Sequence, residues 1–94
     1  MRKLITIVGM TYKFGSSVIE IGDVVDLKAD PNNEHDREAI AVYYQGKHIG
    51  FVANSTRTVI RGCNSAGNLI NYTHNDLSAE VILKMADIAI AELV

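Results

Sequence analysis

The sequence predicts a small, mainly β barrel of about six strands with one or two short helices, formed by a single domain over residues 1–94. Short segments rich in branched and aromatic residues recur along the chain, and turn-forming residues separate them. Most of the expected strands are joined by short connections, which is typical of an antiparallel meander. A chain of 94 residues has few other ways to protect its edge strands, so a closed or nearly closed barrel is favoured.

Four strands are expected in the first part of the chain. Gly22-Asp23 is a turn signal before the second strand, and the polar run 30–36 separates the second strand from the third. Gln45-Gly46 has the length and composition of a two-residue hairpin connection. The expected strands are residues 4–10, continuing toward Tyr12, and then 24–29, 39–44 and 47–52.

The later part of the chain predicts one helix and two more strands. Asn54 or Ser55 can cap a short amphipathic helix over residues 57–63, which residues 64–68 end. Residues 79–85 and 88–94 are apolar runs that form a last hairpin or one long bent strand. A continuous helix over 77–93 is the competing interpretation, because Ala, Glu, Leu, Lys and Met favour helix. Alternation of isoleucine and alanine over residues 88–91 favours strand.

Composition restricts the possible partners and compartments. Nine basic and eleven acidic residues give a net charge of −2, whereas proteins that grip phosphate backbones non-specifically show a basic face. Any binding of nucleic acid is therefore expected to be local and weak. Cys63 is the one cysteine, so no internal disulfide forms and a reducing compartment, the cytoplasm, is favoured. We expect Cys63 to pack as a small hydrophobe.

Membrane insertion, metal binding and catalysis receive no support from the residues. The apolar run at residues 4–10 is too short for a signal peptide or a membrane span. His35, His48 and His74 lack the spacing of metal ligands. No nucleophile elbow, phosphate loop or pair of histidines is present. The sequence therefore predicts a binding module that is not an enzyme and carries no cofactor or metal.

The run from Asp30 to Val42 is the most informative segment. It places polar groups at the mouth of a strand, where a rigid scaffold commonly holds binding residues. Asp36 is expected first of all to cap the turn through a backbone N–H, a role that is compatible with binding a ligand. His35 is expected to be exposed to solvent. Tyr12, at a strand end, is interpreted either as half-buried packing or as a base-stacking residue.

Three motifs in this chain resemble those of the HIRAN domain, a small β-barrel module related in shape to OB-folds. Val8-Gly9 followed by Tyr12 matches the family's first motif, and Ile49-Gly50-Phe51-Val52 matches the third. The second and most specific motif is D-P-x-N-x-x-D-x-x-A-I-x-V, which matches residues 30–42. The resemblance covers about residues 4–62.

The resemblance implies recognition of the free 3′ end of single-stranded DNA. It nominates Tyr12 to stack on a terminal base and Asp36 to accept the hydrogen bond of the 3′-hydroxyl, with His35, Phe51 and Asn33 in the same pocket. Thr11 and Asn54 stand where basic residues are expected to contact phosphate, so two phosphate contacts are lost. Four acidic residues in the loop would repel a phosphate backbone unless only its uncharged end enters.

Two further interpretations remain open. Arg57 and Arg61 lie four residues apart on the expected helix and are the best remaining candidates to bind phosphate, although such a pair is usually a solvated surface. The alternative function is a protein-interaction or scaffold module that has lost DNA binding and presents its barrel edge to a partner. The resemblance also suggests a helicase, nuclease or other DNA-processing protein as a partner.

Overall fold

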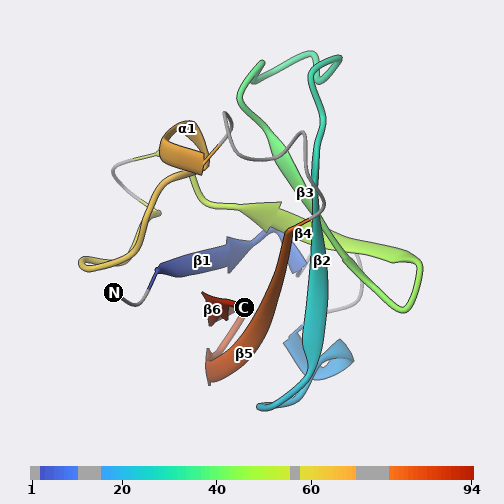
Figure 1. The fold of residues 1–94 in the computed structure, drawn as a ribbon, viewed down its shortest axis with the longest axis vertical. Coiled ribbons are helices and arrows are strands. Elements are labelled where there is room, and N and C mark those ends of the chain that lie inside the picture. Colours follow the sequence, from blue (N-terminus) through green and yellow to red (C-terminus); the bar gives the residue numbers. More distant parts are fainter. Residues whose placement is uncertain (1–2, 11–15, 56–57, 70–76) are drawn as a thin grey trace.

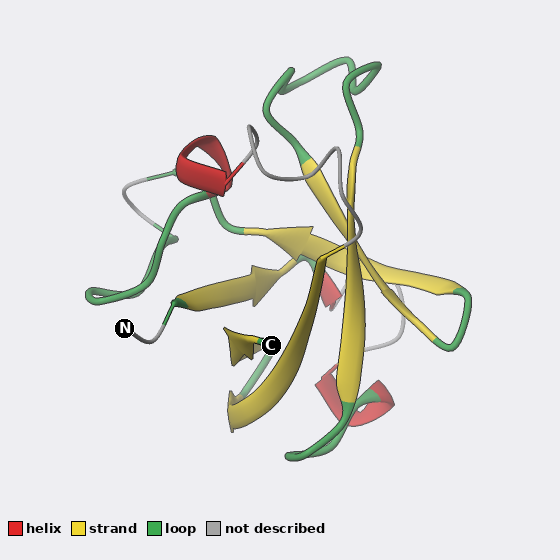
Figure 2. Ribbon diagram, in the orientation of Figure 1, coloured by secondary structure: helices red, strands yellow, loops and turns green. Residues whose placement is uncertain are grey.

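A computed structural model of the chain describes residues 3–10, 16–55, 58–69 and 77–94 (Figure 1). The principal elements of the described residues are six strands and two short helical segments (Figure 2). The strands are β1 (Leu4–Val8), β2 (Val24–Ala29), β3 (Ile40–Tyr44), β4 (Lys47–Val52), β5 (Leu77–Met85) and β6 (Ile88–Leu93). The helical segments are a 3-10 turn, η2 (Ser16–Val18), and an α-helix, α1 (Ala66–Leu69).

The six strands close into an antiparallel barrel in the order β1-β4-β3-β2-β5-β6. This arrangement confirms the predicted fold class. The expected meander is wrong, because β1 pairs with β4 and β2 pairs with β5, strands that do not follow one another in the chain. Closure gives every described strand two neighbours, although β1 and β4 pair at only two positions.

The barrel interior holds the apolar core. β2 shows the alternation expected of a half-buried strand, because Val25 and Leu27 are buried while Val24 and Asp26 are exposed. Small alanines from β5 and β6 are also fully buried, which lets these two strands pack closely. The largest fully buried apolar side chains are Ile5, Ile7, Met10, Ile19, Leu27, Ile40, Ile49 and Leu69.

Residues 77–93 form the hairpin β5–β6, which confirms the strand interpretation and excludes the continuous helix. Its turn is Ala86-Asp87, where Ala86 adopts a φ of 45°. The connection between β3 and β4 is the expected two-residue turn, with positive φ angles at Gln45 (50°) and Gly46 (83°). Two positive φ angles match the twist of the flanking strands, as in a type I′ turn.

The predicted helix over residues 57–63 is wrong in its position. Of the residues described there, 58–63 form turns, and Gly62 has a φ of 98°, which a right-handed helix does not accommodate. This segment is instead tied to β1. The Ile60 N–H donates to the buried Thr6 Oγ1 at 3.1 Å, and the Asn64 N–H donates to the Leu4 carbonyl at 2.7 Å. These bonds to β1 hold the segment in turns, in which the Val59 N–H keeps one helix-type bond to the Ser55 carbonyl at 2.9 Å.

Helix α1 begins where the predicted helix was expected to end. Ser65 caps it, because its Oγ accepts the Asn68 N–H at 3.3 Å. The Ala66 N–H donates to the Ala53 carbonyl at 3.0 Å, which anchors the helix start to the chain just after β4. Cys63 is partly buried and unbonded to another cysteine. Among the described residues, no helix has both the length and the apolar character needed to cross a membrane.

Candidate functional site

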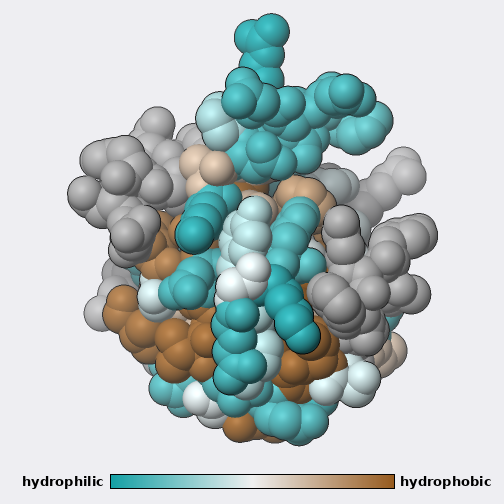
Figure 3. Space-filling view, turned by 90° about the vertical axis from the view of Figure 1, so that its right-hand side faces the viewer, coloured by the Kyte–Doolittle hydropathy of each residue, from teal (hydrophilic) through white to brown (hydrophobic). Residues whose placement is uncertain are grey.

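The loop between β2 and β3 projects from one end of the barrel, and Figure 3 shows it as a hydrophilic protrusion at the top of the molecule. Its base is closed by the Asp30 N–H, which donates to the Ala39 carbonyl at 2.8 Å. Within the loop, Asn33 Oδ1 accepts the N–H groups of His35 at 2.9 Å and Asp36 at 3.1 Å. The turn-forming residues that the sequence places here therefore hold the loop in one shape.

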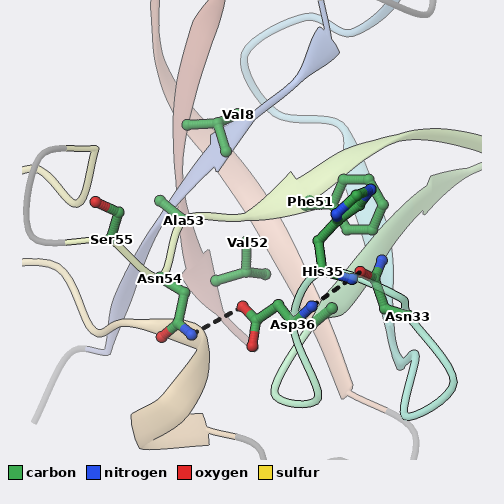
Figure 4. Close-up of a pocket in the computed structure, with 10 residues that line it drawn as sticks. Val8, Asn33, His35, Asp36, Phe51, Val52, Ala53, Asn54 and Ser55 are labelled. Carbon is green, nitrogen blue, oxygen red and sulfur yellow. Dashed lines mark hydrogen bonds between the residues drawn. The ribbon is translucent and has the colours of Figure 1, made fainter.

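Asp36 caps its turn as expected. Its Oδ1 accepts the Glu38 N–H at 2.8 Å, and its Oδ2 accepts the Asn54 amide at 3.0 Å (Figure 4). The carboxylate is partly exposed, and each of its oxygens has a second lone pair that these bonds leave unused. The same carboxylate can therefore serve the turn and accept a hydrogen bond from a ligand.

Asn54 connects the loop to helix α1. Its amide nitrogen donates to Asp36 and, at 3.2 Å, to Glu38 Oε1. Its Oδ1 accepts the Gly67 N–H at 2.8 Å. Both amide hydrogens are thus used within the protein, so Asn54 positions Asp36 rather than offering a donor to phosphate.

A pocket lies between this loop and the ends of β1 and β4, with a volume of about 290 Å³. Figure 4 shows the Asp36 carboxylate and the Asn54 amide directed toward one another at its wall. The pocket is lined by Val8, Asn33, His35, Asp36, Ala39, Phe51, Val52, Ala53, Asn54 and Ser55. Among these described residues there is no lysine or arginine, so the pocket suits an uncharged group better than a phosphate.

The structure brings together five of the nine residues that the sequence nominated. Those that line the pocket are Asn33, His35, Asp36, Phe51 and Asn54. His35 is exposed, as expected. Thr11, Tyr12 and Arg57 lie outside the described residues. Arg61 is exposed and lines a separate hollow beside Asn54 and Cys63.

Five lining residues were missed by the sequence reasoning: Val8, Ala39, Val52, Ala53 and Ser55. Four of them are apolar, and Val52 and Ala53 are almost fully buried. Apolar residues at strand ends carry no sign that distinguishes a pocket wall from core packing. Only the meeting of the β1 and β4 ends, Val8 paired with Phe51, brings them to one site. No group of three or more potential metal ligands occurs in the described part of the chain.

The fold and the pocket define a small β-barrel binding module. A family model described as the HIRAN domain matches residues 4–80, and the chain belongs to this family of DNA-binding modules. No curated protein matches the chain. Among solved structures, the crystal structure of the HIRAN domain of human HLTF is similar, with a TM-score of 0.74 and 22% sequence identity over 98% of this chain and 72% of that chain. At that identity, the likeness shows the shared fold.

Proposed function

We propose that this domain binds the 3′ end of single-stranded DNA, weakly, through the pocket of His35, Asp36 and Phe51 together with Tyr12. The observation that carries the proposal is the Asp36 carboxylate, which faces a pocket whose described lining contains no lysine or arginine and which retains lone pairs after the two bonds to Glu38 and Asn54. A neutral sugar hydroxyl can donate to such an acceptor. A phosphate group at the same place is repelled by the carboxylate, because both groups are negatively charged.

The aromatic groups of the pocket support the proposal. Phe51 lines the pocket and contacts His48 edge-on, with ring centroids 4.8 Å apart. Stacking of a base on an aromatic ring contributes about 1–3 kcal/mol and tolerates any base. This form of recognition needs no basic surface, so it suits a chain with a net charge of −2.

The test compares two fluorescent oligonucleotides that differ only at the 3′ end, by fluorescence anisotropy at low salt. A hydrogen bond to a charged acceptor is worth about 1.5–3 kcal/mol, so we expect the 3′-hydroxyl form to bind at least about tenfold tighter than the 3′-phosphate form. Asp36→Ala should abolish this preference. Tyr12→Ala should weaken both ligands equally.

Glu34→Ala is the matched control, because it removes a carboxylate from the same exposed loop and should leave the preference intact. Asp36→Asn serves as a second variant if Asp36→Ala loosens the loop, since its Oδ1 can still accept the Glu38 N–H. Asp36→Asn should lose the preference for the 3′-hydroxyl over the 3′-phosphate oligonucleotide. Equal affinity of the folded wild-type protein for the two ends, or no binding, would favour the protein-interaction function instead.

One observation favours that second function. Five large apolar side chains are exposed among the described residues, and four of them lie in β2, in β5 or just before β2: Ile21 (63%), Val24 (50%), Leu83 (43%) and Met85 (40%). Apolar residues on an outer face are typical of protein-binding surfaces. A partner that stays bound through size-exclusion chromatography, and is lost with Leu83→Glu, would support this function. Leu83→Glu should leave the binding of oligonucleotides unchanged.

A further inference from the structure

A row of rings on β4 and β3 leads away from the pocket toward Lys28 on β2, the next strand of the barrel. Phe51 at the pocket contacts His48 with ring centroids 4.8 Å apart, and His48 stacks on Tyr43 with centroids 5.2 Å apart. Lys28 Nζ lies over the Tyr43 ring, 5.0 Å from its centroid. We refer to Phe51, His48 and Tyr43 as the ring row.

A β-bulge creates the ring row. The register shifts between Val42, which pairs with Gly50, and Tyr43, which pairs with His48, so Ile49 is the extra residue. Residues three apart on a regular strand point to opposite faces. The bulge instead brings His48 and Phe51 to the same outer face, while Ile49 is fully buried. The hydrogen bond between His48 Nε2 and the Gly50 carbonyl, at 2.9 Å, holds the imidazole across the bulge.

The end of the row carries a positive charge, which the described lining of the pocket does not. Lys28 is exposed, and within the described residues no carboxylate lies at ion-pair distance from its ammonium group. Asp26, the acidic neighbour that pairs with Tyr43 across β2 and β3, accepts a hydrogen bond from Ser78 Oγ at 3.3 Å. The Tyr43 ring and the Lys28 ammonium therefore form a half-buried aromatic surface beside a cation.

We infer that the ring row and Lys28 bind the nucleotides on the 5′ side of the terminal one, so that the strand runs from the pocket across the outer face of β4, β3 and β2. This inference rests on the proposed function. A base displaces the Lys28 ammonium from the Tyr43 ring, and the ammonium then neutralises a backbone phosphate. At the rise of about 3.4 Å per stacked nucleotide, roughly six nucleotides are enough to reach from the pocket to Lys28.

The test compares a thymidine dinucleotide with a thymidine hexanucleotide, both with free 3′-hydroxyls, by nitrogen-edited NMR titration and anisotropy. We expect both ligands to shift the amide signals of Asp36 and Asn54. Only the hexanucleotide should shift those of Tyr43 and Lys28, and it should bind about tenfold tighter, since one stacked base contributes that much. Tyr43→Ala should remove this gain and leave the affinity for the dinucleotide unchanged; Tyr43→Leu repeats the test if the alanine variant is unstable.

Lys28→Ala should lower the salt dependence of hexanucleotide binding by about 0.7 in the log–log slope, the value for one phosphate contact on a single strand. Lys47→Ala, which removes an exposed lysine from the β3–β4 hairpin that carries Tyr43 and His48, should leave the slope unchanged. Equal affinities for the two lengths, with shifts confined to the pocket, would overturn the inference and leave end recognition standing. Shifts at the ring row alone would contradict end recognition but support binding on this face. No shift at either place, in the folded protein, would overturn both.

Discussion

Asn54 illustrates how one residue determines the shape of the site. It forms three side-chain hydrogen bonds, to Asp36, to Glu38 and from Gly67, which join the β2–β3 loop to helix α1. The family resemblance suggested a phosphate-contacting position here. In this chain the amide instead holds the carboxylate that we propose to recognise the DNA end.

Replacing this residue therefore has a predictable cost. We expect Asn54→Ala to lower the free energy of unfolding by roughly 1.5–3 kcal/mol, because three hydrogen bonds are lost and the Gly67 N–H is left without its acceptor. Urea unfolding measures the change. Asn68→Ala, at an exposed position in α1, is the control and should change stability by less than about 0.5 kcal/mol. Equal effects of the two substitutions would contradict the role given to Asn54.

At the scale of elements, the junction of β1 and β4 determines where the pocket walls meet. This junction has only two paired positions, Ile7 with Val52 and Val8 with Phe51. Beyond it, the edge of β1 is covered by single hydrogen bonds, such as the one from the Ala53 N–H to the Thr6 carbonyl at 2.8 Å. Gly50 lies in β4 directly against this junction, where a Cβ atom would come within 2.5 Å of the Val8 carbonyl oxygen.

We expect Gly50→Ala to destabilise the barrel by about 2 kcal/mol or more, since a backbone atom of β1 must move to admit the methyl group. The Phe51 amide signal should move as well, because its pairing with Val8 is disturbed. Gly46→Ala is the comparison. Its added Cβ meets nothing within 4 Å, and only the positive φ of 83° opposes it, so the loss should be about 1 kcal/mol. Thermal unfolding followed by circular dichroism compares the stabilities of the two variants. A larger loss of stability for Gly46→Ala would show that β1 and β4 lie farther apart at Gly50 than described.

At the scale of the whole molecule, the charge balance limits how this domain can hold DNA. The net charge is −2, and the proposed path for the strand passes one described lysine, Lys28. Aromatic stacking and the hydroxyl hydrogen bond must then supply most of the affinity. Such interactions depend little on salt.

The dependence of binding on salt should accordingly be shallow. For a hexanucleotide we expect a log–log slope of about −0.7 to −1.4, which corresponds to one or two neutralised phosphates. Anisotropy titrations between low and physiological salt measure it. A slope several times steeper would mean that a basic surface, rather than the pocket and ring row, dominates binding.

Much of the barrel could be predicted from the sequence because its signals are local. Strand positions follow from branched residues and from turn residues such as Gln45-Gly46, and the loop geometry follows from side chains that bond to their own backbone, as Asn33 and Asp36 do. The helix was misplaced because Ile60 and Asn64 bond to β1, more than fifty positions away in the chain. Local propensity does not contain such distant partners.

The sequence by itself determined where most strands lie along the chain, the turn at the β2–β3 loop and the presence there of Asp36, since each depends on neighbours within a few residues. Only the tertiary structure decided which residues share the pocket. Closure of the barrel brings Val8 and Phe51 together, and the bulge at Ile49 turns His48 to the face of Phe51. The tertiary structure also gave Asn54 its role, because Asn54 holds a carboxylate that lies 18 positions earlier in the chain. Contacts of this kind depend on the packing of whole strands, which no local pattern of residues specifies.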